Sequence, residues 1–164
     1  MSDIVTTRAL AATDYDDLIS LYRELMGKLP VLAGTQGYRR FEEILTHPGT
    51  HIIGAVATGR NDGGQSAGRV VSVATLHVLA NLTHEGRPYA LIENVVTLQS
   101  WRGQGLARQV MLHAQDLAWQ RDAYKIMLLT GKAAGARAFY QKLGYRSDEK
   151  HAMTLRRAPL RITE

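Results

Sequence analysis

Cysteine is absent from this chain of 164 residues. Without a thiol the chain can form no disulfide, no thiolate-bound zinc or iron–sulfur site, and no covalent intermediate on cysteine. Apolar runs are short as well, each under ten residues, whereas crossing a bilayer takes about twenty. The first ten residues, MSDIVTTRAL, lack the charged start and apolar stretch of a secretion signal. We therefore expect a soluble, cytoplasmic protein that does not associate with a membrane.

Repeats and low-complexity segments are also lacking, and the composition is that of a folded domain. Apolar residues make up 45% of the chain and charged residues 21%, close to the average of globular proteins. A chain of 164 residues is long enough to bury a core of its own and short for two domains. We expect one domain over residues 1–164.

The charge balance is basic, with 20 Lys and Arg against 15 Asp and Glu, a net charge of +5. Such a balance favours anionic partners, among them nucleic acids and phosphorylated small molecules. The basic residues are scattered, with short pairs at Arg39–Arg40 and Arg156–Arg157, and aromatic residues make up 7% of the chain. These features favour a phosphate-bearing ligand and give no indication of a nucleic-acid surface.

Apolar periodicity predicts alternating helices and strands. Helical spacing covers residues 13–29, 38–46, 103–121 and 133–143. Strand patterns cover residues 51–58, 69–79, 88–98 and 125–130, and the last strands are expected within 145–157. This order indicates an α+β fold in layers.

The loop Arg102–Ala107, RGQGLA, directly follows a predicted strand and opens a predicted helix. Its two glycines let the backbone approach a ligand closely, and the helix start offers N–H groups with a partial positive charge. Such an arrangement can bind a pyrophosphate. A tight turn that uses its glycines only for packing is the alternative interpretation.

Three polar residues nearby are candidates for chemistry. Glu93 and Asn94 interrupt an apolar strand pattern, and burial would raise the pKa of a carboxyl there toward that of a working base. A Glu on a solvated edge strand is the alternative. Tyr140 lies on a short predicted helix and could donate a proton, although a half-buried tyrosine of the core fits the same pattern. His77 and His84 could line an acceptor pocket. The Arg39–Arg40 pair could meet an anionic acceptor, and a solvated helix face is the alternative interpretation.

Two of these segments together resemble the GNAT superfamily of N-acetyltransferases. Arg102–Ala107 is similar to its Arg/Gln-x-x-Gly-x-Gly/Ala motif, and Phe139–Tyr145, FYQKLGY, is similar to its closing motif. The segments IENVV (92–96) and YKI (124–126) look most like the glucosamine-6-phosphate N-acetyltransferases. The resemblance implies a mixed, mostly antiparallel sheet of six to seven strands with about four helices, splayed to admit acetyl-CoA.

The resemblance also implies the ligands and the site. Acetyl-CoA would be the donor, and no metal is expected. The cofactor-binding positions implied are Val95, Val96, Thr97, Arg102, Gly103, Gln104, Gly105, Leu106, Ala107, Arg108 and Tyr140. Glu93 would act as base directly or through a water, and Asn94 would orient or bind the acceptor. Tyr140 would protonate the departing thiolate, and a backbone N–H at Val95 or Val96 would hold the oxyanion.

The implied reaction moves an acetyl group directly to a primary amine of a small molecule, and an amino sugar phosphate is the candidate acceptor. Two alternatives remain: acetylation of a peptide or protein amine, and a regulatory module that binds acetyl-CoA without turnover. No nucleic-acid partner is expected, and a homodimer is possible because many similar proteins are dimers.

Overall fold

A five-stranded mixed sheet forms the centre of the structure, a computed structural model that describes residues 4–59, 68–131 and 135–155. The elements in chain order are β1 (Ile4–Ala9), α1 (Tyr15–Met26), α2 (Gly34–Thr46), β2 (Thr50–Thr58), β3 (Arg69–Leu79), β4 (Tyr89–Thr97), α3 (Leu106–Gln120), β5 (Ile126–Leu128) and α4 (Ala136–Gln141). The strands lie side by side in the order β1-β2-β3-β4-β5. The pairs β1–β2, β2–β3 and β3–β4 are antiparallel, and β4–β5 is parallel.

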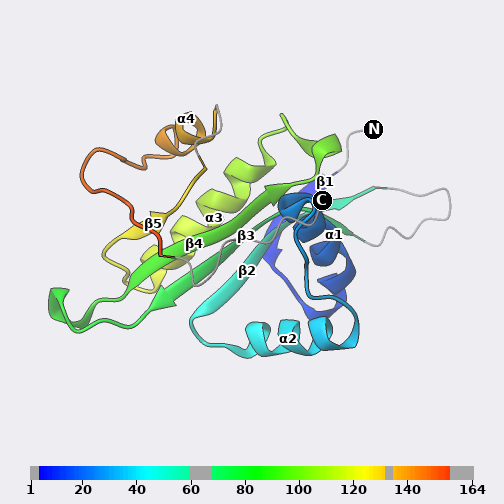
Figure 1. Cartoon of the computed structure of the whole chain (residues 1–164), viewed down its shortest axis with the longest axis horizontal. Coiled ribbons are helices and arrows are strands. Elements are labelled where there is room, and N and C mark those ends of the chain that lie inside the picture. The colour runs from blue at the N-terminus through cyan, green and yellow to red at the C-terminus, as the bar shows by residue number, and fades with distance from the viewer. Residues whose placement is uncertain (1–3, 60–67, 132–134, 156–164) are drawn as a thin grey trace.

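Helices cover both faces of this sheet (Figure 1). α3 packs mainly on β3 and β2, α1 on β3 and β4, and α2 on β2. Successive residues of β2 show that the helices lie on opposite faces. The Thr50 side chain lines a cavity together with α2 residues. The next residue, His51, lies close enough to Arg121, at the end of α3, for that positive charge to lower its pKa, in addition to the effect of burial. The central strands β2 and β3 are accordingly buried on both faces over most of their length.

The helices form because their apolar residues recur on one side. In α1, Leu18 and Leu21 are buried against the sheet. In α3, Val110, Met111 and Ala114 are fully buried at the three- and four-residue spacing of a helix face. These residues belong to one contiguous core that both layers of helices share with the sheet.

β4 carries the main irregularity of the sheet. Its register with β3 shifts between the pairs Thr75↔Glu93 and Val73↔Val96, so one extra residue is inserted in β4. Asn94 lies in this bulge with a φ of 55°, the left-handed conformation that Asn tolerates better than most residues. The pairing with β5 ends at Ile92↔Leu128. Within the described residues, β4 therefore continues beyond the bulge as an edge strand on its β5 side.

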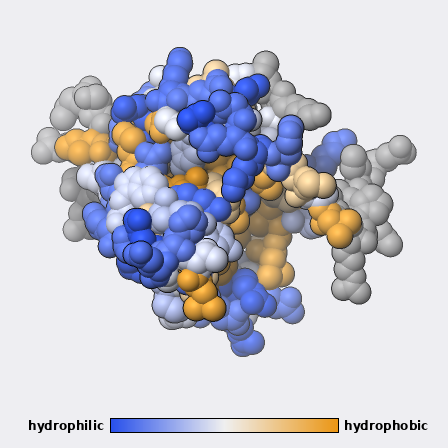
Figure 2. Space-filling view, turned by 90° about the vertical axis from the view of Figure 1, so that its left-hand side faces the viewer, coloured by the Kyte–Doolittle hydropathy of each residue, from blue (hydrophilic) through white to orange (hydrophobic). Residues whose placement is uncertain are grey.

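Polar side chains dominate the end of the molecule that faces the viewer in Figure 2, and hydrophobic side chains there form small, separate groups. Among the described residues, no helix is long and apolar enough to span a membrane.

The number of strands differs from the prediction of six to seven, since the described residues contain five. The strands predicted within 145–157 are wrong as far as the structure describes them, because residues 145–155 contain no strand. Residues 146–155 are all exposed, Met153 and Leu155 among them, so this segment buries no apolar face against the sheet as a strand would. Arg146 forms ion pairs with Asp148 and Glu149 along it. Residues 156 and 157 lie outside the described residues.

β1 was missed, although its residues Ile4–Thr7 are all β-branched. The prediction of a last helix over 133–143 is confirmed for Ala136–Gln141, and residues 133 and 134 lie outside the described part.

Candidate active site

Two cavities are lined by consecutive residues at the bulge of β4, one by Val95 and the other by Asn94. The first, here called the α4 cavity, has a volume of about 550 Å³. It is lined by Glu24, Leu25, Val95, Val96, Thr97, Arg102, Ala107, Ala136, Phe139 and Tyr140. Six of the eleven cofactor positions implied by the resemblance line this cavity: Val95, Val96, Thr97, Arg102, Ala107 and Tyr140. The cavity thus lies between the free edge of β4, the loop after it and α4.

The loop Arg102–Ala107 has the backbone that a ligand cradle requires. Gly103 and Gly105 have φ values of 78° and 77°, which residues with a side chain rarely adopt. A Cβ at either glycine would meet no atom within 4 Å, so the space beside the loop is open. Gly105 is the residue that precedes α3, and its carbonyl accepts the helical hydrogen bond of Gln109. The N–H groups of the first turn of α3 therefore have no helical partner.

The other implied cofactor positions divide into two kinds. Gln104 and Arg108 are exposed beside the two glycines, at the start of α3. The Leu106 side chain is buried in the core, so it could meet a ligand only through its backbone. The open loop, the helix start and the free strand edge together fit a long ligand with a phosphorylated end.

Arg102 is held by two contacts within the α4 cavity. Its Nε donates a hydrogen bond to the Thr97 carbonyl at 3.1 Å, and one terminal nitrogen donates to Glu24 Oε1 at 2.7 Å. Glu24 comes from α1 and was not predicted from the sequence. The carboxylate of Glu24 therefore balances the charge that Arg102 would offer to an anionic ligand.

Tyr140 projects from α4 into the same cavity. Its ring makes edge-on contacts with Phe139 and Tyr145, at centroid distances of 5.0 and 6.0 Å. Burial raises the pKa of Tyr140 above its ordinary value, and the nearby negative charge of Glu93 raises it further. The phenol is therefore protonated at neutral pH and can donate a proton or a hydrogen bond.

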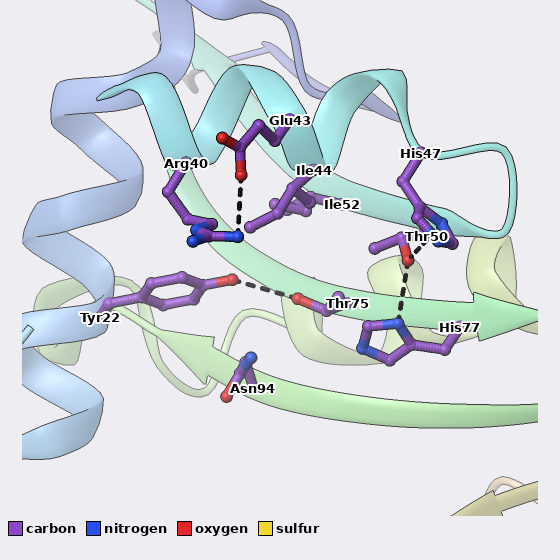
Figure 3. Close-up of a pocket in the computed structure, with 10 residues that line it drawn as sticks. All are labelled: Tyr22, Arg40, Glu43, Ile44, His47, Thr50, Ile52, Thr75, His77 and Asn94. Carbon is purple, nitrogen blue, oxygen red and sulfur yellow. Dashed lines mark hydrogen bonds and ion pairs between the residues drawn. The ribbon is translucent and has the colours of Figure 1, made fainter. Parts of the chain in front are cut away.

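The second cavity, here called the α2 cavity, has a volume of about 360 Å³ (Figure 3). It is lined by Tyr22, Arg40, Glu43, Ile44, His47, Thr50, Ile52, Thr75, His77 and Asn94. Asn94, His77 and Arg40 were candidates from the sequence. The others come from α1, α2, β2 and β3 and were not, because separate elements bring them together.

Polar pairs line this cavity. Arg40 forms an ion pair with Glu43 at 2.8 Å, and both side chains are more than 60% exposed. The Tyr22 hydroxyl and Thr75 Oγ1 are hydrogen-bonded at 3.1 Å. Burial raises the pKa of Tyr22, against the opposing influence of hydrogen bonds with Thr75 and Asn94. The α2 cavity can therefore bind a polar molecule that makes several hydrogen bonds.

The bulge borders both cavities. Asn94 lines the α2 cavity, whereas the next residue, Val95, lines the α4 cavity. Glu93 lines neither, but its charge influences the pKa of His77 on one side and of Tyr140 on the other. Both cavities thus lie beside the same short stretch of β4, Glu93–Val95.

His84 was expected to line an acceptor pocket, but it is not among the residues that line the α2 cavity. It is exposed, and its ring stacks on Tyr124 with the centroids 3.8 Å apart. Residues 4–59, 68–131 and 135–155 contain no group of three or more His, Asp or Glu side chains placed to hold a metal ion.

Comparison with known proteins agrees with this architecture. The model of the acetyltransferase (GNAT) family matches residues 18–145. A glucosamine 6-phosphate N-acetyltransferase of Trypanosoma brucei brucei is 29% identical over 158 residues, which cover 92% of this chain and 96% of that protein.

Solved structures give the same result. A putative acetyltransferase from Agrobacterium tumefaciens has a TM-score of 0.78 at 35% identity and covers 93% of this chain and 99% of its own. An aminoglycoside N-acetyltransferase solved in complex with CoA has a TM-score of 0.74 at 18% identity. The match covers 96% of this chain and 98% of that one. The chain therefore belongs to the GNAT family of N-acetyltransferases.

Proposed function

We propose that this protein transfers the acetyl group of acetyl-CoA to the primary amine of a small molecule, with both substrates bound at once. The observation that carries the proposal is the bulge of β4, whose consecutive residues Asn94 and Val95 line two different cavities. A direct transfer requires the amine and the thioester to meet at such a junction. The chain has no cysteine to carry the acetyl group.

The α4 cavity is the proposed donor site. The pyrophosphate of acetyl-CoA would bind the N–H groups from Gly103 to Ala107 at the start of α3. The pantetheine arm would pair with the free edge of β4 beyond the bulge, as an added strand does. Support comes from the open loop, from the early end of the β4–β5 pairing, and from the structural neighbour solved with CoA.

The proposed chemistry uses two side chains, Glu93 of β4 as the base and Tyr140 of α4 as the acid. Glu93 attracts the acceptor ammonium and takes its proton first, directly or through a water. The amine then attacks the thioester, and a backbone N–H at Val95 or Val96 stabilises the oxyanion. The bond from the carbonyl carbon to sulfur then breaks, and Tyr140 protonates the departing thiolate, in agreement with its raised pKa and its place in the α4 cavity. The acetylated nitrogen loses its second proton, which restores the Tyr140 phenol.

The α2 cavity is the proposed acceptor site, and an amino sugar phosphate is the proposed class of acceptor. Its hydroxyl, amide and imidazole groups suit the hydroxyls of a sugar. The exposed Arg40 can exchange Glu43 for a phosphate at little cost, because surface ion pairs are weak. The relative from Trypanosoma brucei brucei, named for glucosamine 6-phosphate, supports the same class.

Two assays test the proposal. Thermal unfolding with and without acetyl-CoA reports donor binding, since a ligand of the native state raises the melting temperature. CoA release is then followed over a panel of amines that includes glucosamine 6-phosphate, other amino sugars and peptides with a free amino terminus.

A thermal shift with release that depends on an amino sugar phosphate is the expected result. Release with peptides only would refute the acceptor class, and a shift without release on any amine would favour a module that binds acetyl-CoA without turnover. No shift at high acetyl-CoA would refute the donor site.

Two expectations from the sequence stay predictions. Analytical ultracentrifugation of the purified chain would decide whether it forms a homodimer, and fractionation of cells would decide whether it is cytoplasmic.

A further inference from the structure

Three side chains at the end of the α2 cavity form a continuous hydrogen-bonded chain (Figure 3). Thr50 Oγ1 lies 3.2 Å from His47 Nδ1 and 3.1 Å from His77 Nδ1. The three residues come from the end of α2, the start of β2 and the end of β3. Thr50 and His77 are paired across the sheet, so their side chains lie on the same face.

A backbone hydrogen bond to His47 bears on which atoms donate and which accept among His47, Thr50 and His77. The N–H of Gly49 donates to His47 Nδ1 at 3.2 Å, so this nitrogen is an acceptor and carries no proton. For both contacts of Thr50 to be hydrogen bonds, its hydroxyl donates its single proton to His47 Nδ1, whose one lone pair is then shared between Thr50 and the Gly49 N–H. The Thr50 oxygen accepts in turn from His77, whose proton therefore lies on Nδ1.

The second nitrogen of His77 consequently has a free lone pair. Figure 3 shows this Nε2 turned into the cavity, toward the side on which Thr75 and Asn94 lie. Burial lowers the pKa of His77 below 6.5, and His47 lowers it further, whereas the charge of Glu93 raises it. The neutral imidazole is thus the dominant form at pH 7.

The ionisable groups around His77 come from three elements. They are Tyr22 of α1, Arg40, Glu43 and His47 of α2 and its end, and Glu93 of β4.

We propose that His77 is the final acceptor of the proton that the acceptor ammonium loses, and that His47 and Thr50 position it by fixing its tautomer. The N–H bond of the ammonium breaks and its electron pair stays on the nitrogen, which attacks the thioester. The proton passes by way of Glu93 or a water to Nε2 of His77, and the imidazolium is stabilised by the ionised Glu93. His77 thus keeps Glu93 ionised for the next transfer. The inference rests on the proposed function, and its first test does not.

That first test is the tautomer of each histidine, read from nitrogen-15 NMR of the unliganded protein at pH 7.5. The spectrum of His77→Gln assigns the signals of His77. We expect the Nδ1–H tautomer at His77 and the Nε2–H tautomer at His47. An Nε2–H tautomer at His77 would overturn the inference, whatever the protein acetylates.

The second test compares the pH dependence of kcat, measured as CoA release with glucosamine 6-phosphate and saturating acetyl-CoA. His77→Gln is expected to lower kcat about a hundredfold, a common contribution of a proton acceptor, and to remove the fall of kcat toward acid pH. Glu93→Gln is expected to move that fall to lower pH, because the charge that raises the pKa of His77 is gone. An unchanged pH profile in His77→Gln would show that Glu93 is the only acceptor and overturn the inference.

Further variants separate the positioning of His77 by Thr50 from a general loss of structure around the site. Thr50→Val breaks the chain and is expected to lower kcat about tenfold with little change in KM, whereas Thr50→Ser keeps the hydroxyl and restores kcat. Equal rates in Thr50→Val and Thr50→Ser would overturn the positioning role. His113→Gln on α3 is the matched control, with kcat expected to stay unchanged. Calorimetric binding of acetyl-CoA should be unaltered in all five variants, so that loss of donor binding is not mistaken for loss of the proton acceptor.

Discussion

The bulge of β4 can be tested by substituting Asn94, because the side chain and the backbone there have separable roles. Asn94 has a φ of 55° and its side chain is exposed. Substitution therefore removes no core packing, and the cost of Asn94→Val lies in the backbone. A β-branched residue in the left-handed region costs about 1–2 kcal/mol. For a domain of this size, 1 kcal/mol corresponds to about 2–4 °C in melting temperature.

Asn94→Val is thus expected to melt about 2–8 °C lower than the parent chain and to bind acetyl-CoA more weakly. The weaker binding follows because relief of the strain would pull Val95 and Val96 out of register. Asn94→Gly is the matched variant, since glycine adopts this φ freely and only the amide is lost. It should keep the affinity for acetyl-CoA and raise KM for the acceptor amine.

Thermal unfolding and calorimetry with acetyl-CoA measure these effects, and steady-state CoA release gives KM. The reasoning would be refuted if Asn94→Val matched Asn94→Gly in both stability and donor affinity. Such a result would mean that the bulge does not depend on the conformation of this residue.

Three other predictions concern single contacts. Tyr140→Phe should lower kcat about a hundredfold and leave the affinity for acetyl-CoA unchanged, because only the donor to the thiolate is lost; an unchanged kcat would contradict this role. Glu24→Gln should tighten CoA binding by up to about fivefold, since it frees Arg102 from an ion pair worth about 1 kcal/mol at most, and calorimetry would expose an error if affinity fell. Arg8 lowers the pKa of Asp14, so this pair stabilises the fold above pH 3.8 and is lost as the pH falls through the lowered pKa. Arg8→Gln should therefore melt about 2–4 °C lower at pH 7, with the difference shrinking below pH 3.8, and an equal difference at both pH values would refute the assignment.

Local signals in the sequence sufficed for the long helices and the central strands. In α3 the apolar residues repeat at helical spacing, and Gly105 marks the start of the helix. β1 was missed because its six residues gain their stability from pairing with β2, nearly fifty residues away. The segment after Tyr145 looked like strand, but residues 146–155 are exposed and bury no apolar surface against the sheet.

The two cavities differ in how far the sequence could predict them. Seven of the ten residues that line the α4 cavity come from three short segments that the sequence analysis singled out, which are 95–97, 102–107 and 139–145. Of the unpredicted members, Ala136 belongs to α4, whereas Glu24 and Leu25 reach the cavity from α1, more than sixty residues before β4. The α2 cavity depends on side chains that meet only in the folded chain, such as Tyr22 with Thr75. His77 could be suspected from the sequence, but its tautomer depends on contacts that no local pattern contains.

The division of labour between the two cavities has an evolutionary consequence. β4 and α1 contribute to both, whereas α2 contributes Arg40, Glu43 and Ile44 to the α2 cavity alone. With the acceptor in the α2 cavity and the donor in the α4 cavity, as proposed, mutations in α2 would change which amine is accepted and leave the residues for the acetyl donor intact. Descendants of one ancestral gene could diverge in substrate through this single helix, and a directed-evolution library for new acceptors would be built there first.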